Sequence, residues 1–296
     1  MFAVYKKELR SYFTTVIGWV FIAFFLVLAG LYFMIYNLLN GMTDFSYVYQ
    51  GVQMFFVLLL VPVLTMRIVA EENRQKTDQL LYTAPVSISR IIVGKYLALI
   101  TLLAIAVLIV STYPLILSGL VNGVATGGET VDFAIAYGAT FGFLLLGAAY
   151  IAIGLFISSL TESQVIAAVA SGVIMIFTYL MSSLAELLPS DHVFIFWFLV
   201  VFIIVVCFVL NFWIHNVWVS VLAGIVAEVV LVVLYLLFTE SFDGLLENFL
   251  SSISITDRYT SFTLGIFDIS ALVYYISVCF LFVFITVQRI KKKRYN

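Results

Sequence analysis

Long apolar runs separated by short polar segments make up most of this chain. A helix needs roughly 20 residues to cross the hydrocarbon core of a bilayer, whereas a transmembrane β-strand needs only ~10. In lipid every backbone amide must find its partner within the protein, so runs of the longer kind are predicted to be helices. Eight runs qualify, approximately 15–36, 52–69, 96–120, 133–158, 165–188, 193–212, 217–238 and 269–287. The predicted fold class is an all-α, polytopic integral membrane protein, a single helical domain of about eight spans over residues 1–296.

Composition excludes a water-soluble fold. Of the 296 residues, 64% are hydrophobic and 10% are charged, whereas a soluble domain is about half apolar and a quarter charged. The net charge of -2 implies no attraction to nucleic acid. Cys207 and Cys279 both fall inside apolar runs, where free thiols acting as small hydrophobic groups are favoured over a disulfide.

The basic residues predict the orientation, because loops rich in Lys and Arg stay on the cytoplasmic side. With eight spans and a cytoplasmic N-terminus, only Arg258 of the 14 basic residues lies outside. Both termini are therefore predicted to be cytoplasmic, in a multi-pass protein of the cell membrane that is surrounded by lipid.

The N-terminal segment 1–13 has helical amphipathic spacing. Its apolar residues are Phe2, Tyr5, Leu9, Tyr12 and Phe13, and Lys6, Lys7 and Arg10 lie on the opposite face. This pattern predicts a helix on the inner membrane surface. The alternative is a basic flank that serves only to orient the first span.

The cytoplasmic segment 67–95 stands out because it holds eight charged residues in 29. Residues 70–83 contain no Gly or Pro and are predicted to form one helix, which ends before Pro85. Ser87 suits the N-cap of a second helix that runs into the third span. A mere connection between two spans would need neither this length nor this charge.

Several motifs in this region and elsewhere resemble one family. They are TMRIVAEENRQKTDQLLYTAPVS at 65–87, VGKYLA at 93–98, YKKELRSYF at 5–13, LLLGAAYIAIGLFISSLTESQ at 144–164 and GIFDISALVYYISV at 265–278. Together they resemble ABC-2-type transporter permeases, the transmembrane subunits, and most closely the gliding-motility-like branch. The resemblance covers residues 1 to about 190 and about 255 to 296.

The chain departs from the family pattern in two places. Members often have Gly-Thr where this chain has Lys76-Thr77, which predicts an unbroken helix here. The family core usually has six spans, so the stretch 190–240 is interpreted as an extra helical hairpin.

The resemblance implies a coupling helix at 71–81 that docks on a cytoplasmic ABC ATPase. Two such ATPase subunits per complex, and a second copy of this permease or a sister permease, are implied partners. The implied coupling residues are Arg67, Glu71, Glu72, Arg74, Lys76, Thr77, Leu80, Leu81, Pro85, Gly94 and Lys95. ATP and Mg are expected on the partner ATPase, and no cofactor is expected on this chain.

The sequence itself supports that division of labour. A Walker A loop requires two glycines and a Lys-Ser/Thr pair at fixed spacing. Gly94-Lys95 is followed by Tyr96, and Ser89 stands where the first glycine belongs. The dipeptide is therefore interpreted as the start of a span and not as a nucleotide site, and no enzymatic activity is expected of this chain.

Other candidate sites are few. His192 and His215 fall at opposite membrane faces, and Glu162-Ser163 has no neighbouring His, so neither a metal site nor a charge-relay site is predicted. Glu228 lies in the middle of the seventh run, where an ionisable group is a functional candidate by default; it lines a substrate route or bonds to a neighbouring helix. Residues 239–268 are expected to form an external interfacial, partly re-entrant or plain surface helix.

The favoured interpretation is the transmembrane permease subunit of an ABC exporter. A secondary, ion-coupled transporter is the alternative, and it requires ion sites at intramembrane carboxylates or broken helices. A membrane scaffold or channel that transports nothing is the third possibility.

Overall fold

A computed structural model describes residues 1–76, 87–123, 130–187, 189, 191–214, 217–238 and 242–295. The described residues contain helices and no strand. They divide into two compact units, one formed by Met1–Tyr179 with Ile255–Asn296 and the other by Leu180–Ser254. The fold class predicted from the hydrophobic pattern is confirmed.

Six helical stretches of the described residues are long and apolar enough to cross a membrane. They match the first five predicted spans and the eighth. Their bounds are Val16–Leu39, Ser46–Gln75, Ile88–Val121, Phe133–Leu160, Gln164–Met181 and Ile269–Lys293. The predicted sixth and seventh runs are the helices α11 (His192–Ile214) and α12 (Val217–Leu237), in which the described apolar stretches are shorter, His192–Phe208 and Gly224–Leu237.

The first unit is built around helix α9 (Phe133–Leu160), which is buried along most of its length. Around it pack α7 (Ile88–Val110), α14 (Asp257–Thr263) and α15 (Ile269–Tyr295). Phe143 of α9 is the centre of an aromatic core. Its ring centroid lies 4.9 Å from those of Tyr49 and Phe56 and 5.8 Å from that of Phe25.

The second span is not a regular α-helix. It consists of α3 (Ser46–Phe55), a wide π-helical turn η2 (Phe56–Leu60) and α4 (Val61–Thr65). Pro62 lies just after the wide turn. Proline lacks the N–H of a regular helix and its ring clashes with the carbonyl four residues earlier, so a locally widened turn accommodates it. A second π-helical stretch, η1 (Met34–Leu39), ends the first span after α2 (Val16–Phe33).

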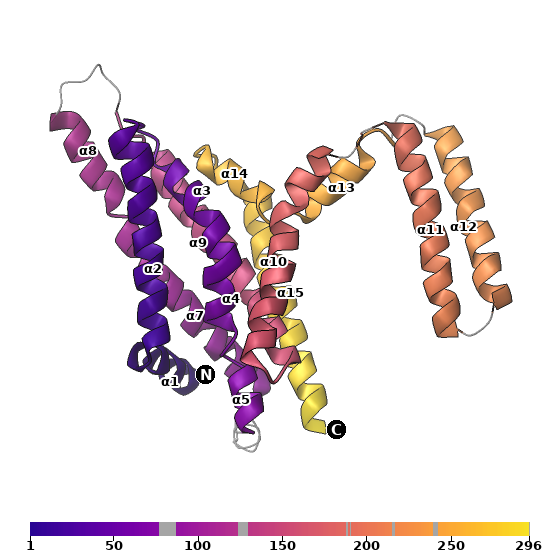
Figure 1. The fold of residues 1–296 in the computed structure, drawn as a ribbon, viewed down its shortest axis with the longest axis horizontal. Coiled ribbons are helices and arrows are strands. Elements are labelled where there is room, and N and C mark those ends of the chain that lie inside the picture. Colours follow the sequence, from indigo (N-terminus) through magenta and orange to yellow (C-terminus); the bar gives the residue numbers. More distant parts are fainter. Residues whose placement is uncertain are drawn as a thin grey trace. The chain divides into compact units, whose positions relative to one another are not determined.

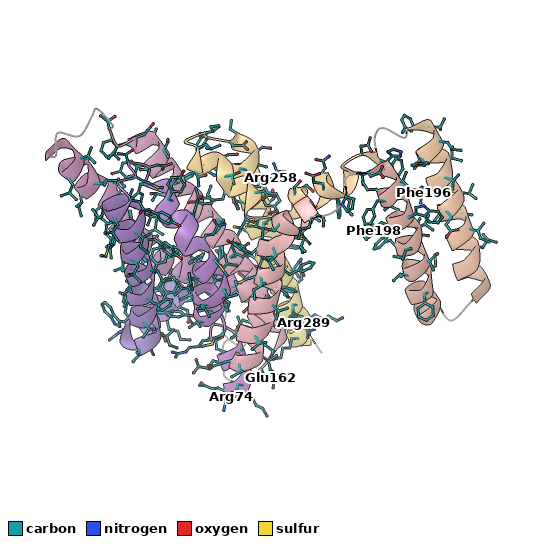
Figure 2. All side chains as sticks on the ribbon, turned by 45° about the horizontal axis from the view of Figure 1, so that its top comes forward. Arg74, Glu162, Phe196, Phe198, Arg258 and Arg289 are labelled. Carbon is teal, nitrogen blue, oxygen red and sulfur yellow. The ribbon has the colours of Figure 1, made fainter. Side chains whose placement is uncertain are left out.

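Both chain termini lie at one end of the first unit, together with α1 (Phe2–Thr14) and α5 (Ala70–Gln75) (Figure 1). Arg74, Glu162 and Arg289 lie toward this end, and Arg258 lies at the opposite end (Figure 2). The opposite end also carries α8 (Tyr113–Gly123), which continues the third span after a bend. This arrangement agrees with the predicted sorting of basic residues.

The second unit contains α11, α12 and α13 (Leu245–Ile253), with a small core of its own. That core is formed by Ile195, Leu231, Phe242 and Leu246. Helix α10 (Gln164–Leu187) runs from the first unit into the second. The stretch 239–268, expected as one amphipathic helix, holds two separate helices, because α14 belongs to the first unit and packs on α9.

Candidate functional site

Helix α5 leaves the cytoplasmic end of the second span and is shorter than predicted. It spans Ala70–Gln75 and stops at Lys76, whose φ of 56° is in the left-handed region. The amide of Lys76 donates to the Asn73 carbonyl oxygen at 3.3 Å, as in a helix C-cap. The prediction that Lys76-Thr77 leaves the helix unbroken is therefore wrong. Lys76 adopts the conformation that a glycine at this position would adopt at less cost.

The first turn of α5 is held by Ser158 near the end of α9. Its buried hydroxyl oxygen accepts from the amides of Val69 and Ala70, at 3.3 and 3.2 Å, and donates to the Met66 carbonyl at 3.1 Å. Helix starts leave amides without intrahelical partners. A side chain from another span satisfies two of them here, which fixes the direction in which α5 leaves the membrane domain.

Replacing Ser158 by alanine is expected to lower the free energy of unfolding by about 1–3 kcal/mol, because buried amides lose their acceptor. The measurement is the thermal unfolding midpoint in detergent micelles. Ser277→Ala is the matched control, since the exposed Ser277 hydroxyl donates only to the Val273 carbonyl of its own helix. Equal midpoints for the two variants would contradict the role given to Ser158.

A buried ion cluster lies beside α5. The Lys95 side chain of α7 is 2% exposed, and its Nζ lies 2.7 Å from Glu72 Oε1 of α5 and 3.3 Å from Glu8 Oε1 of α1. Lys95 Nζ also donates to the Ile68 carbonyl at 2.9 Å. Lys7, which is exposed, lies 3.4 Å from Glu8 and 3.6 Å from Glu72. Two ammonium groups and two carboxylates thus balance one another.

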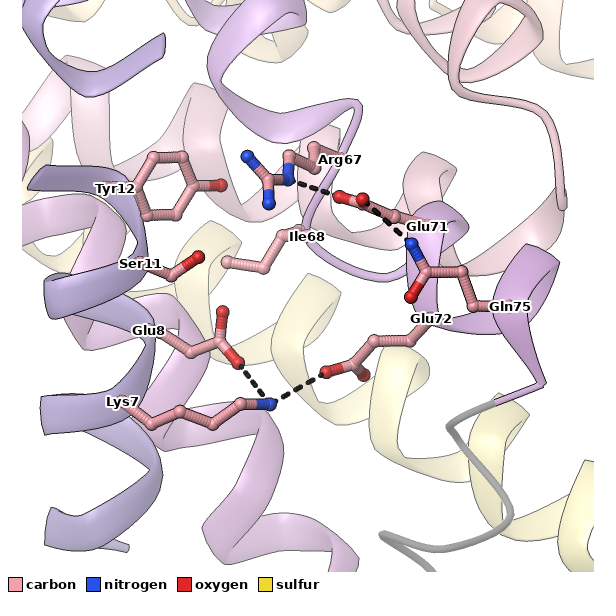
Figure 3. A pocket seen from close by; sticks show the side chains of 9 residues that line it. All are labelled: Lys7, Glu8, Ser11, Tyr12, Arg67, Ile68, Glu71, Glu72 and Gln75. Atoms are coloured by element: carbon pink, nitrogen blue, oxygen red, sulfur yellow. Dashed lines mark hydrogen bonds and ion pairs between the residues drawn. The ribbon is translucent and has the colours of Figure 1, made fainter. Parts of the chain in front are cut away.

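The same residues line a pocket of about 280 Å³ between α1 and α5 (Figure 3). Arg67 pairs with Glu71 across one helical turn, and Gln75 Nε2 donates to Glu71 Oε1 at 3.1 Å. On the α1 side, the Tyr12 hydroxyl donates to the Leu64 carbonyl at 3.0 Å. Burial raises the pKa of Tyr12, with Glu8 as the next cause, so this phenol remains a hydrogen-bond donor at neutral pH.

The predicted coupling residues therefore separate into two groups. Glu71, Glu72, Arg67 and Lys95 make ion pairs within the chain, so the expectation that the two carboxylates face a partner is corrected. Arg74 and Lys76 are exposed. Thr77, Leu80, Leu81 and Pro85 lie outside the described residues. Ser87 is the N-cap residue of α7 as predicted, although its side chain makes no capping bond.

Gly94 has a packing role that its sequence context did not reveal. A Cβ at this position would lie 3.0 Å from the Met1 carbonyl oxygen and 3.4 Å from the Tyr5 amide. The missing side chain lets α1 approach α7 closely. Glu8 was also missed, because on sequence alone it is one more charge on the polar face of an amphipathic helix.

The second unit brings together a group that sequence reasoning did not find. Asp191, His192 and Asp243 lie close enough for their ligand atoms to reach one ion. His192 Nδ1 is 3.1 Å from Asp243 Oδ1 and 3.3 Å from Asp191 Oδ1. Both carboxylates are more than half exposed, and the Asp243 carboxylate also accepts from the His192 amide. His–Asp pairing at the start of α11 accounts for the group.

The remaining candidates are spread over the molecule. Glu228 is half-buried in α12, and no hydrogen bond to it is seen among the described residues. Glu162 is exposed in the turn between α9 and α10. Cys207 and Cys279 are both free thiols, as predicted, and His215 lies outside the described residues.

The helices and charges define an all-α, multi-pass protein of the cell membrane with a charged helix at its cytoplasmic end. A family model described as ABC-2 family transporter protein matches residues 2–190, well over half of the chain. The chain belongs to this family, and it is therefore a permease of an ABC transporter. No curated protein and no solved structure matches it.

Proposed function

We propose that this chain couples ATP hydrolysis in separate ABC ATPase subunits to export of a substrate across the membrane. The observation that supports this proposal is α5, a charged helix at the end of the second span that is fixed to α9 by Ser158 and to α7 by Lys95. A helix held by several spans transmits a displacement to them, whereas a loop with no such contacts would absorb it.

The surface that α5 offers to an ATPase is basic. Arg74 and Lys76 are exposed at its far end, whereas Glu71 and Glu72 are engaged with Arg67 and Lys95. Opposite charges across an interface guide association and fix its register. We therefore expect acidic groups on the ATPase surface that receives α5.

The complex that we propose contains two ATPase subunits, which hold ATP and Mg, and a second permease, either another copy of this chain or a sister chain. This chain contributes no cofactor. Export is the direction proposed, on family resemblance. Glu228 is assigned, as part of this proposal, to the wall of the substrate route.

Reversal of both exposed charges, Arg74→Glu with Lys76→Glu, is expected to weaken copurification of the coexpressed ATPase at least about tenfold, through repulsion from its acidic groups. The readout is the amount of ATPase retained per permease after affinity purification in mild detergent. Arg289→Glu with Lys292→Glu is the control, because these residues are also exposed basic groups at the cytoplasmic end. Full retention of the ATPase by the Arg74/Lys76 variant would overturn the assignment of this surface.

A purified chain that moves cargo along an ion gradient, with no ATPase present, would favour the secondary transporter instead. The test is a flux measurement in sealed vesicles containing only this chain.

A further inference from the structure

We propose that Lys95 joins α1, α5 and α7 into one mechanical body, so that a displacement of α5 is carried to the interface helix and the third span as well as the second span. The inference rests on the proposed function, because it concerns what happens when an ATPase moves α5. It assigns Lys95 as a positioning residue and makes α1 part of the moving machinery.

The first support is the burial of Lys95. A buried ammonium is strongly disfavoured unless opposite charges and hydrogen bonds compensate for the water that it loses. Lys95 meets this condition only through groups on other elements, namely Glu72 of α5 at 2.7 Å, Glu8 of α1 at 3.3 Å and the Ile68 carbonyl at 2.9 Å. Any relative motion of the three helices would leave these buried charges less well compensated, so the cluster favours motion together.

The second support is the seating of α1 on the third span. Gly94 leaves room for the Met1 carbonyl, and the Tyr5 hydroxyl lies 3.1 Å from Thr101 Oγ1 one turn further along the span. Glu8, in the next turn of α1, is therefore held against the same helix that carries Lys95. Helix α1 is attached to α7 along its length and is more than an orienting flank.

The third support is how little else links α5 to α1. Within α5 only Ala70 and Asn73 are buried, and the Asn73 side chain bonds to the Thr161 carbonyl and to Lys293, not to α1. The remaining direct ion pair, Lys7 with Glu72, is 3.6 Å long and its lysine side chain is 62% exposed. Exposed pairs of this kind contribute little, so the path from α5 to α1 runs through Lys95.

Glu8→Gln tests this path, because it removes the α1 carboxylate and leaves the pair between Lys95 and Glu72 in place. Spin labels at Arg10→Cys and Arg74→Cys, both exposed positions, would report the distance between α1 and α5. The full chain is reconstituted in lipid nanodiscs with Cys207 and Cys279 replaced by serine. We expect a narrow distance distribution with Glu8 present and one about twofold broader in Glu8→Gln, since a released surface helix moves as a loop or terminus does.

A second label pair at Glu162→Cys and Arg289→Cys, also exposed, separates a local effect from general loosening. Its distribution should not change in Glu8→Gln. Unchanged width for the α1–α5 pair would overturn the proposal, and so would equal broadening of both pairs. Because this experiment contains no ATPase, its failure is distinct from a failure of the copurification experiment, which concerns the proposed function.

Discussion

Lys95→Met is expected to lower the free energy of unfolding by about 3–5 kcal/mol, the usual cost of removing one partner from a buried ion pair. Methionine fills nearly the same volume, so the loss comes from charge and hydrogen bonding, not from a cavity. The variant leaves the Glu8 and Glu72 side chains, which are 11% and 18% exposed, facing each other without a cation between them. The readout is unfolding by increasing SDS in mixed micelles, followed by circular dichroism.

Two further variants isolate the cause of the Lys95→Met effect. Lys292→Met removes an exposed lysine and should change stability little. Adding Glu8→Gln and Glu72→Gln to Lys95→Met removes all three buried charges and should recover most of the stability, because neutral replacements of buried ionic groups are often tolerated. A triple variant no more stable than Lys95→Met alone would show that packing, not charge balance, gives Lys95 its importance.

Phe143→Ala is expected to cost about 3–5 kcal/mol of the unfolding free energy, as large-to-small changes in a packed core do. Phe143 is fully buried, and its ring contacts come from four elements: Phe25 of α2, Tyr49 of α3, Phe56 of η2 and Tyr259 of α14. Close packing is a main force between helices within a membrane, where lipid is as apolar as the side chains. The same SDS titration measures the loss.

Phe280→Ala provides the comparison for Phe143→Ala. Phe280 is 72% exposed on α15, so a lipid chain can replace most of the contacts that its ring makes. We expect a small change for this variant. Similar losses for both phenylalanines would mean that the ring cluster around Phe143 does not hold the first unit together.

The hydrophobic pattern was sufficient for the spans because bilayer thickness imposes a minimum length on any crossing helix. It did not reveal the wide turn before Pro62, since π-helical register depends on neighbouring packing and leaves the apolar run unbroken. Basic residues indicated the common side of α5 and both termini. They did so through a rule about translocation, which carries no information about which lysine is buried.

The coupling site was predictable as a segment and not as a set of contacts. Lys95 and Glu8 are 87 positions apart, and each belongs locally to an ordinary basic or amphipathic flank. Ser158 marked only the end of a span, although it holds the start of α5. Lys76 ended the helix because its backbone adopts a left-handed conformation, which local propensity for a non-glycine residue does not predict.

The wide turn η2 also bears on how insertions and deletions in this chain would be tolerated. Each residue of an α-helix advances the chain by about 100° around the axis, and a π-type turn absorbs one additional residue. Loss of one residue within Phe56–Leu60 would restore regular winding and swing everything that follows, α5 included, by about that angle. The heading of the cytoplasmic helix is thus decided by residue count at mid-membrane, far from the surface that it addresses.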